Sequence, residues 1–202
     1  SIDGFILSVA KETLSKGDYH HLSETIDQGI PIVMFDRVID EIECDKVIVD
    51  DVQTSKKAVQ KLVDFGCQNI GIISTKDYVS VGRLRTEGYI KALKENEFKV
   101  NENHILKIQD EFISEDNLKD LERQIDEYLN SNTDLDAIFA VNELYAVTAM
   151  KVARKMKLQI PDDMQVIGFT DGVFSKHAYP PLSTVSQNGY EMGRMAAKLL
   201  IN

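Results

Sequence analysis

The chain has 202 residues, of which 43% are hydrophobic and 28% are charged, a composition typical of globular proteins. Its net charge is −10, and a domain this acidic repels phosphate backbones, which argues against duplex DNA binding by this chain alone. Its two cysteines are too few for a disulfide framework, so we expect reduced thiols in a cytoplasmic protein.

The start of the chain predicts neither a membrane protein nor a signal peptide. No apolar run approaches the length of a membrane helix. The first residues, Ser1–Leu7, lack a basic region and a cleavage site, and they enter a predicted strand almost at once. Since an initiator Met is also missing, we expect this chain to be an excised piece of a longer protein.

Short apolar runs rich in Ile, Val and Phe recur along the chain, as is typical of strands buried on both faces. In chain order the predicted strands are Gly4–Leu7, Pro31–Phe35, Lys46–Val49, Ile70–Ile73, Ile105–Ile108, Ala137–Val141 and Gln165–Phe169.

Amphipathic stretches with helical spacing lie between these runs. The clearest are Val52–Phe65, Glu115–Asn130 and Glu143–Met156, and Ser114 is placed to cap the second of them. No Gly/Ser tract or Pro-rich spacer interrupts the alternation. Strand–helix–strand repetition of this kind predicts an α/β fold with parallel strands and helices on both faces.

Catalytic and metal-binding signatures are absent from the sequence. None of the common nucleophile, zinc-protease, phosphate-loop or dinucleotide motifs occurs. His20 and His21 would point about 100° apart on a helix, so solvent-facing histidines are favoured over a metal site. Cys67 has no nearby His and is interpreted as a small buried thiol. We therefore expect no metal, no cofactor and no enzymatic activity.

Polar groups that follow the predicted strands are the candidates for recognition of a polar small molecule, because open α/β sheets bind ligands there. Asp36 and Arg37 follow one strand, where a simple ion pair is an equally good interpretation for Arg37. Arg83 and Arg85 precede Gly88, and a position on the helix surface remains open for Arg83. Arg85 is expected to project over a solvated site from the first turns of its helix and to contribute little to folding, although an ion pair with an acidic neighbour that holds the helix in place remains open. Asn142 is placed either to cap a helix or to face a ligand.

An ordered series of blocks resembles the LacI/GalR family of bacterial transcription regulators over nearly the whole chain. Any single block is weak, but the series in this order is highly specific. The blocks are Ile2–Leu7, Gly29–Val33 with Asp36-Arg37, Val49–Asp51, Leu62–Gly66, Ile70–Ile73, Arg85–Tyr89, Ala137–Asn142, Ile160–Asp163, Val166–Phe169, and Pro180–Val185 with Gln187.

This resemblance implies a periplasmic-binding-protein-like fold, with two Rossmann-like subdomains and a ligand cleft between them. Residues 1–49 and 186–202 would form an incomplete N-terminal subdomain, and residues 50–185 the C-terminal one. The helix-turn-helix would be missing from this chain. Ligand binding would change how a homodimer presents its DNA-binding helices.

The resemblance also implies site residues, position by position. Asp36, Arg85 and Asn142 match ligand-binding residues of the family, Phe112 lies near its stacking aromatic, and Ser8 faces the cleft. Glu143 and Thr170 depart from the family pattern, which usually has Asp at both positions. Glu143 is a mild change at a mainly structural position, whereas Thr170 replaces a ligand-contacting carboxylate, so ligand identity cannot be copied from any member.

The assembly implied by the resemblance is a homodimer. Helix Glu143–Met156 and loop Val173–Tyr179 would lie near its two-fold axis, with Val147 and Tyr179 as contact residues.

Three functions are weighed on these observations. The first is the effector-binding and dimerisation domain of a regulator that senses a sugar-like metabolite. The second is an extracytoplasmic sugar-binding protein of a transporter, which shares the fold. The third, an enzyme on a Rossmann-like sheet, lacks any catalytic signature. The Asp36-Arg37 and Pro180–Val185 blocks favour the regulator.

Overall fold

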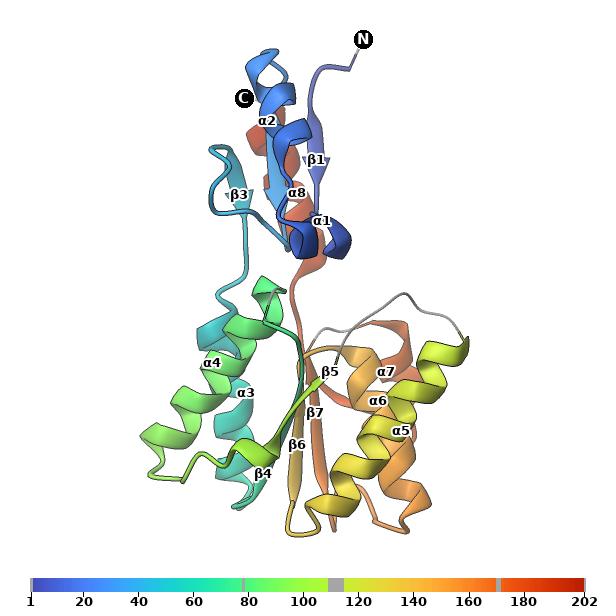
Figure 1. Ribbon diagram of the computed structural model, residues 1–202. Helices are drawn as coiled ribbons and strands as arrows, with labels where there is room; N and C mark the ends of the chain where they lie inside the picture. Colours follow the sequence, from blue (N-terminus) through green and yellow to red (C-terminus); the bar gives the residue numbers. More distant parts are fainter. Residues whose placement is uncertain (1, 78, 109–114, 170–171, 202) are drawn as a thin grey trace. The chain divides into compact units, whose positions relative to one another are not determined.

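The structure is a computed structural model that describes residues 2–77, 79–108, 115–169 and 172–201 (Figure 1). The chain divides into two compact units. Unit 1 consists of residues 1–50, 77–81 and 188–202, and unit 2 consists of residues 51–76 and 82–187.

Unit 1 is built on a parallel sheet of three strands in the order β1-β2-β3. These strands are β1 (Phe5–Leu7), β2 (Ile32–Phe35) and β3 (Asp45–Val47). Helices α1 (Lys11–Lys16) and α2 (His20–Asp27) connect β1 to β2, and α8 (Gly189–Ile201) packs against all three strands. Since β2 is the central strand, both of its faces need apolar cover.

Side chains of β2 alternate between two small cores, as the two-residue period of a strand requires. Ile32 and Met34 pack in a cluster with Leu22 of α2. Val33 points the other way and packs with Met192 and Ala196 of α8. The apolar run of β2 is therefore explained by burial on both faces.

Unit 2 holds a five-stranded parallel sheet in the order β5-β4-β6-β7-β8. The strands are β4 (Ile70–Thr75), β5 (Ile105–Ile108), β6 (Ala137–Ala140), β7 (Gln165–Phe169) and β8 (Ser183–Val185). The helices are α3 (Asp51–Asp64), α4 (Ser80–Glu95), α5 (Glu115–Ser131), α6 (Glu143–Lys155) and the short α7 (Val173–His177), with a 3₁₀ turn at Glu102–His104.

The helices of unit 2 cover both faces of its sheet. Helix α3 packs on β6 and β7, and α4 lies beside α3 on the same side (Figure 1). Helices α5 and α6 pack against each other on the opposite face. Strands β4 and β6 are buried along their whole length, with Ile72, Ile73, Ile138 and Phe139 fully inaccessible. This double cover explains why their sequences are apolar without alternation.

The predicted α/β fold with parallel sheets is confirmed, and most element ends agree within two residues. Three details differ. Strand β3 ends at Val47 rather than Val49, Ser183–Val185 forms an unpredicted edge strand, and the expected loop from Val173 contains helix α7. The predicted cap Ser114 lies outside the described residues.

No helix in the described ranges is long and apolar enough to cross a membrane.

Candidate functional site

The first polar cluster lies in unit 1, where β1 and β2 end side by side. Ser8 follows β1, and Asp36 and Arg37 follow β2; we call these three residues the Asp36 cluster. The Asp36 Oδ2 atom accepts a hydrogen bond from Ser8 Oγ at 3.5 Å and lies 3.3 Å from Arg37 Nη1. The structure therefore brings together Ser8 and Asp36, as the parallel strand order predicts.

The backbone of Asp36 adopts the left-handed conformation, with φ of +60°. For a residue other than glycine this conformation costs about 1 kcal/mol or more, and Asp and Asn tolerate it best. The Asp36 amide donates to the Val47 carbonyl, which holds the conformation in place. The half-buried carboxylate thus has a fixed direction before any ligand arrives.

Arg37 has a structural role within this cluster. Its Nε donates to the Val9 carbonyl at 2.7 Å while its Nη1 pairs with Asp36. The ion-pair interpretation of Arg37 is confirmed, and the separate bond from Arg37 Nε to the Val9 carbonyl joins the segments that follow β1 and β2.

The second polar cluster lies in unit 2, beyond the carboxyl ends of β6 and β7. Arg85 Nε donates to Asp51 Oδ1 at 2.8 Å, and its Nη1 donates to the Val141 carbonyl at 2.6 Å. The guanidinium carbon lies 3.5 Å from the centre of the Phe169 ring, within cation–π range. Asp51, Arg85, Phe169 and the Val141 carbonyl form the Arg85 cluster.

The surroundings of Arg85 correct one expectation from the sequence. A ligand-gripping arginine was expected to project into solvent and to contribute little to folding. Instead Arg85 is only 4% exposed and is held by a buried carboxylate, a carbonyl and an aromatic ring. The reason is that Gly88 lets α4 approach α3 closely, which brings Arg85 beside Asp51 at the start of α3. Its ligand-binding role stays a prediction.

Asp51 and Phe169 were not singled out as site residues from the sequence. Each appeared only within a block of the family resemblance. Their positions at element ends could have indicated a site, because Asp51 is the first residue of α3 and Phe169 is the last residue of β7.

Asn142 caps helix α6, as one of its two interpretations requires. Its Oδ1 atom accepts from the Tyr145 amide at 2.8 Å. The cap uses the side-chain oxygen of Asn142. In the chain, Asn142 directly follows Val141, whose carbonyl belongs to the Arg85 cluster. A ligand contact by Asn142 stays a prediction.

The remaining predicted residues fall into two groups. Phe112 and Thr170 lie outside the described residues. Val147 is half-buried on α6, and Tyr179 is 82% exposed after α7. Their part in an interface between copies stays a prediction.

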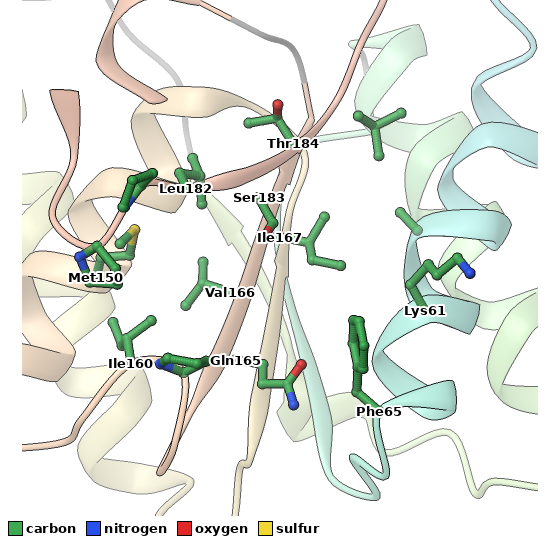
Figure 2. A pocket seen from close by; sticks show the side chains of 15 residues that line it. Lys61, Phe65, Met150, Ile160, Gln165, Val166, Ile167, Leu182, Ser183 and Thr184 are labelled. Carbon is green, nitrogen blue, oxygen red and sulfur yellow. The ribbon is translucent and has the colours of Figure 1, made fainter. Parts of the chain in front are cut away.

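A separate groove of about 400 Å³ runs along β7 and β8 in unit 2 (Figure 2). Its walls are mainly apolar and include Phe65, which directly follows α3, Met150 of α6, Ile160 and Leu182. It meets β7 at Gln165–Ile167, the amino-terminal part of the strand, whereas Phe169 lies at the carboxyl end. The groove lacks the convergent polar groups of the two clusters, which remain the better candidates for a polar ligand.

The described residues contain no group of three or more His, Cys, Asp or Glu that could hold a metal ion. The exposed His20 pairs with Glu24 one turn further along α2. Burial of the Cys67 thiol raises its pKa from 9.0 to about 11, with a smaller contribution from the charge of Asp136. A thiol with so high a pKa is a poor nucleophile at neutral pH.

The chain is similar in sequence and in structure to known proteins. A family model described as a periplasmic binding protein-like domain matches residues 59–202, well over half of the chain. The chain belongs to the periplasmic binding protein-like domain family. The domain is 31% identical, over 203 aligned positions, to a probable HTH-type transcriptional regulator EndR from Paenibacillus polymyxa, covering 99% of this chain and 56% of the relative.

Solved structures place the domain among the same proteins. A regulatory protein of the LacI family from Chloroflexus aggregans superimposes with a TM-score of 0.83 and 27% identity, covering 98% of this chain and 68% of that one. A complex of the transcriptional regulator CelR with cellobiose gives a TM-score of 0.83 and 26% identity, covering 98% and 58%. The resemblance to LacI/GalR regulators read from the sequence is confirmed, and the region matched is their effector-binding domain.

The domain spans about half the length of the curated relatives it matches. Those relatives are named as transcriptional regulators, which does not favour a transport protein or an enzyme.

Proposed function

We propose that this chain is the effector-binding and dimerisation domain of a DNA-binding transcriptional regulator, acting as a repressor in the cytoplasm. It would bind a small polar metabolite through residues of both clusters and would not be an enzyme. Operator binding would belong to a helix-turn-helix outside this chain. Residues 1–49 with 186–202, and residues 50–185, would be the two subdomains.

The observation that carries this proposal is the pre-oriented carboxylate of Asp36. It is half-buried at the carboxyl ends of two parallel strands, and its strained backbone fixes its direction. A carboxylate accepts hydrogen bonds from hydroxyl groups and does so more strongly than a neutral acceptor. This geometry suits a ligand rich in hydroxyls, and the cellobiose complex of the similar CelR agrees with a sugar-like compound.

The Arg85 cluster would supply the second set of contacts. Its members Asp51, Arg85 and Phe169 are almost fully buried, and the half-buried Asn142 beside them supplies an accessible polar side chain. Ser8, Phe112 and Thr170 complete the proposed contacts.

A thermal-shift screen of sugars, sugar phosphates and nucleobases tests the proposal, because a ligand that binds the folded state raises the melting temperature. Asp36→Asn keeps a residue that tolerates the left-handed backbone but removes the charge. It should weaken the binding of any hit by about tenfold or more. The matched control is Asp40→Asn at an exposed position of the same unit. Equal affinity of the Asp36 variant and the wild type would refute this site assignment.

A further inference from the structure

Both arginines of the two polar clusters are paired with a carboxylate of their own cluster. Arg37 Nη1 lies 3.3 Å from Asp36 Oδ2, and Arg85 Nε lies 2.8 Å from Asp51 Oδ1. Each guanidinium also donates to a nearby backbone carbonyl. The positive charge of each arginine is therefore balanced within the protein, before any ligand binds.

This pairing removes both arginines as partners for an anionic ligand. Arg85 is only 4% exposed, so a phosphate or carboxylate group cannot reach it without opening the cluster. The side chain of Arg37 is 29% exposed, but an anion that bound there would also lie beside the Asp36 carboxylate. Because like charges repel strongly at short range, Asp36 opposes the binding of such a ligand.

Acidic residues also outnumber basic ones where the strands end. Ligands of parallel α/β sheets bind beyond the carboxyl ends of the strands, so charges at these ends act on a ligand directly. Among the three residues that follow each strand, four described residues carry a carboxyl group and two are basic. The former are Asp36, Asp50, Asp77 and Glu143, and the latter are Arg37 and Lys76. At the same positions, the residues outside the described ranges add three carboxyl groups and no base to the sequence.

Lys76 is the exposed base among these residues. It directly follows β4, and the acidic Asp77 comes next in the chain. Salt screens a single exposed charge strongly, and an exposed lysine contributes little to an ion pair. Lys76 by itself therefore gives an anionic ligand little affinity.

The two clusters offer hydrogen-bonding groups rather than a net charge. Asp36 and Ser8 lie together beyond β1 and β2, and Asn142 is half-buried beside the Arg85 cluster. Hydroxyl groups donate to such carboxylate and amide oxygens without bringing a charge of their own. A cationic ligand gains less, because Arg37 and Arg85 already balance the carboxylates that it would seek.

We infer that the ligand of this site is an uncharged, hydroxyl-rich compound and that the site discriminates against sugar phosphates and sugar acids. This inference rests on the proposed function and narrows its ligand class. The discrimination comes from the paired arginines and the acidic strand ends, which act against the wrong ligand rather than for the right one.

The experiment measures ligand affinity in the natural protein that carries this chain, at constant ionic strength. The compounds form sets built on glucose, galactose and mannose, each with the neutral sugar, its phosphate ester, its uronic acid and its amino sugar. A thermal-shift screen identifies the members that bind, and isothermal titration gives their dissociation constants. Asp36→Asn removes the carboxylate that balances Arg37. Asp40→Asn, at an exposed position of the same unit, is the matched control.

We expect the neutral sugar of at least one set to bind about tenfold or more tightly than its phosphate ester and its uronic acid. In Asp36→Asn this preference should shrink by about tenfold, because Arg37 no longer has its carboxylate partner. Asp40→Asn and Lys76→Gln should both keep the preference of the wild type. The wild type and Lys76→Gln test the inference even if Asp36→Asn does not fold.

A phosphate ester or uronic acid that binds as tightly as its neutral sugar would overturn the inference and leave the proposed function standing. Loss of that binding in Lys76→Gln would then identify Lys76 as the anion's partner. Tighter binding of an amino sugar would overturn the uncharged ligand, and an unchanged preference in a folded Asp36→Asn would refute the role of the Asp36–Arg37 pair. If no member of any set raises the melting temperature, the sugar-like ligand of the proposed function is refuted, and this inference with it.

Discussion

At the scale of single residues, removal of the Arg85 side chain should strongly destabilise the fold. It is buried against Asp51 and Phe169, so Arg85→Ala leaves an uncompensated buried carboxylate. Breaking a buried ion pair by removing one partner costs about 3–5 kcal/mol of unfolding free energy. Urea denaturation should show this loss in the absence of any ligand.

The control for Arg85 is Arg123→Ala on α5. Arg123 makes ion pairs with Asp120 and Glu127, but its side chain is exposed to water and salt, so its loss should barely change the free energy of unfolding. If both variants unfold at the same urea concentration, the Arg85 cluster does not stabilise the fold, and ligand binding is the remaining role for Arg85.

Cys67 gives a second prediction at this scale, on alkaline stability. Burial raises the pKa of its thiol from 9.0 to about 11, so the folded state keeps the thiol protonated where the unfolded state ionises. The stabilisation is complete below pH 9 and is lost as the pH rises to about 11. The wild type should therefore lose more unfolding free energy than Cys67→Ala between pH 8 and pH 10.5. Equal losses would show that the thiol does not contribute.

At the scale of elements, the packing of α4 on α3 depends on Gly88. A Cβ atom there would lie 2.4 Å from the Val52 carbonyl and 2.8 Å from the Ser55 Cβ, both on α3. Because backbone cannot move aside cheaply, Gly88→Ala should destabilise the fold by about 1–3 kcal/mol. Chemical denaturation measures this directly.

Gly193 in α8 is the matched control, because a Cβ atom there would meet nothing within 4 Å. Gly193→Ala should stabilise the chain by about 0.5–1 kcal/mol, through the lower backbone entropy of its unfolded state. Opposite signs for the two Gly→Ala changes are the expected result. A stabilising Gly88→Ala would contradict the close packing of α3 and α4.

At the scale of the whole molecule, net charge decides the interaction with nucleic acid. The chain carries −10 at neutral pH, and phosphate contacts are the main source of non-specific DNA affinity. We expect no mobility shift of duplex DNA by this chain at physiological salt. A shift that weakens as the salt concentration rises would show a basic surface that the net charge does not reveal. Such a shift would contradict the proposal that DNA binding belongs to a domain outside this chain.

The sequence by itself determined the class of fold and most of its elements. Apolar runs such as Ile70–Ile73 identify doubly covered strands because burial on both faces leaves no place for polar side chains. Strand order places Ser8 and Asp36 at one edge, and an Asn before an amphipathic run predicts the cap at Asn142. The edge strand β8 was missed because Ser183–Val185 is only partly buried and does not form an apolar run, and the five-residue helix α7 is too short to show helical periodicity.

Only the tertiary structure decided what the polar residues contact. Arg85 and Asp51 are 34 positions apart, and their pairing depends on how closely Gly88 lets two helices approach. The contact of Glu143 with Gly172 and Ser175 likewise joins α6 to the segment after β7. Periodicity reports which face of an element is buried, but burial of a charged group requires a partner that only the packing of distant segments can supply.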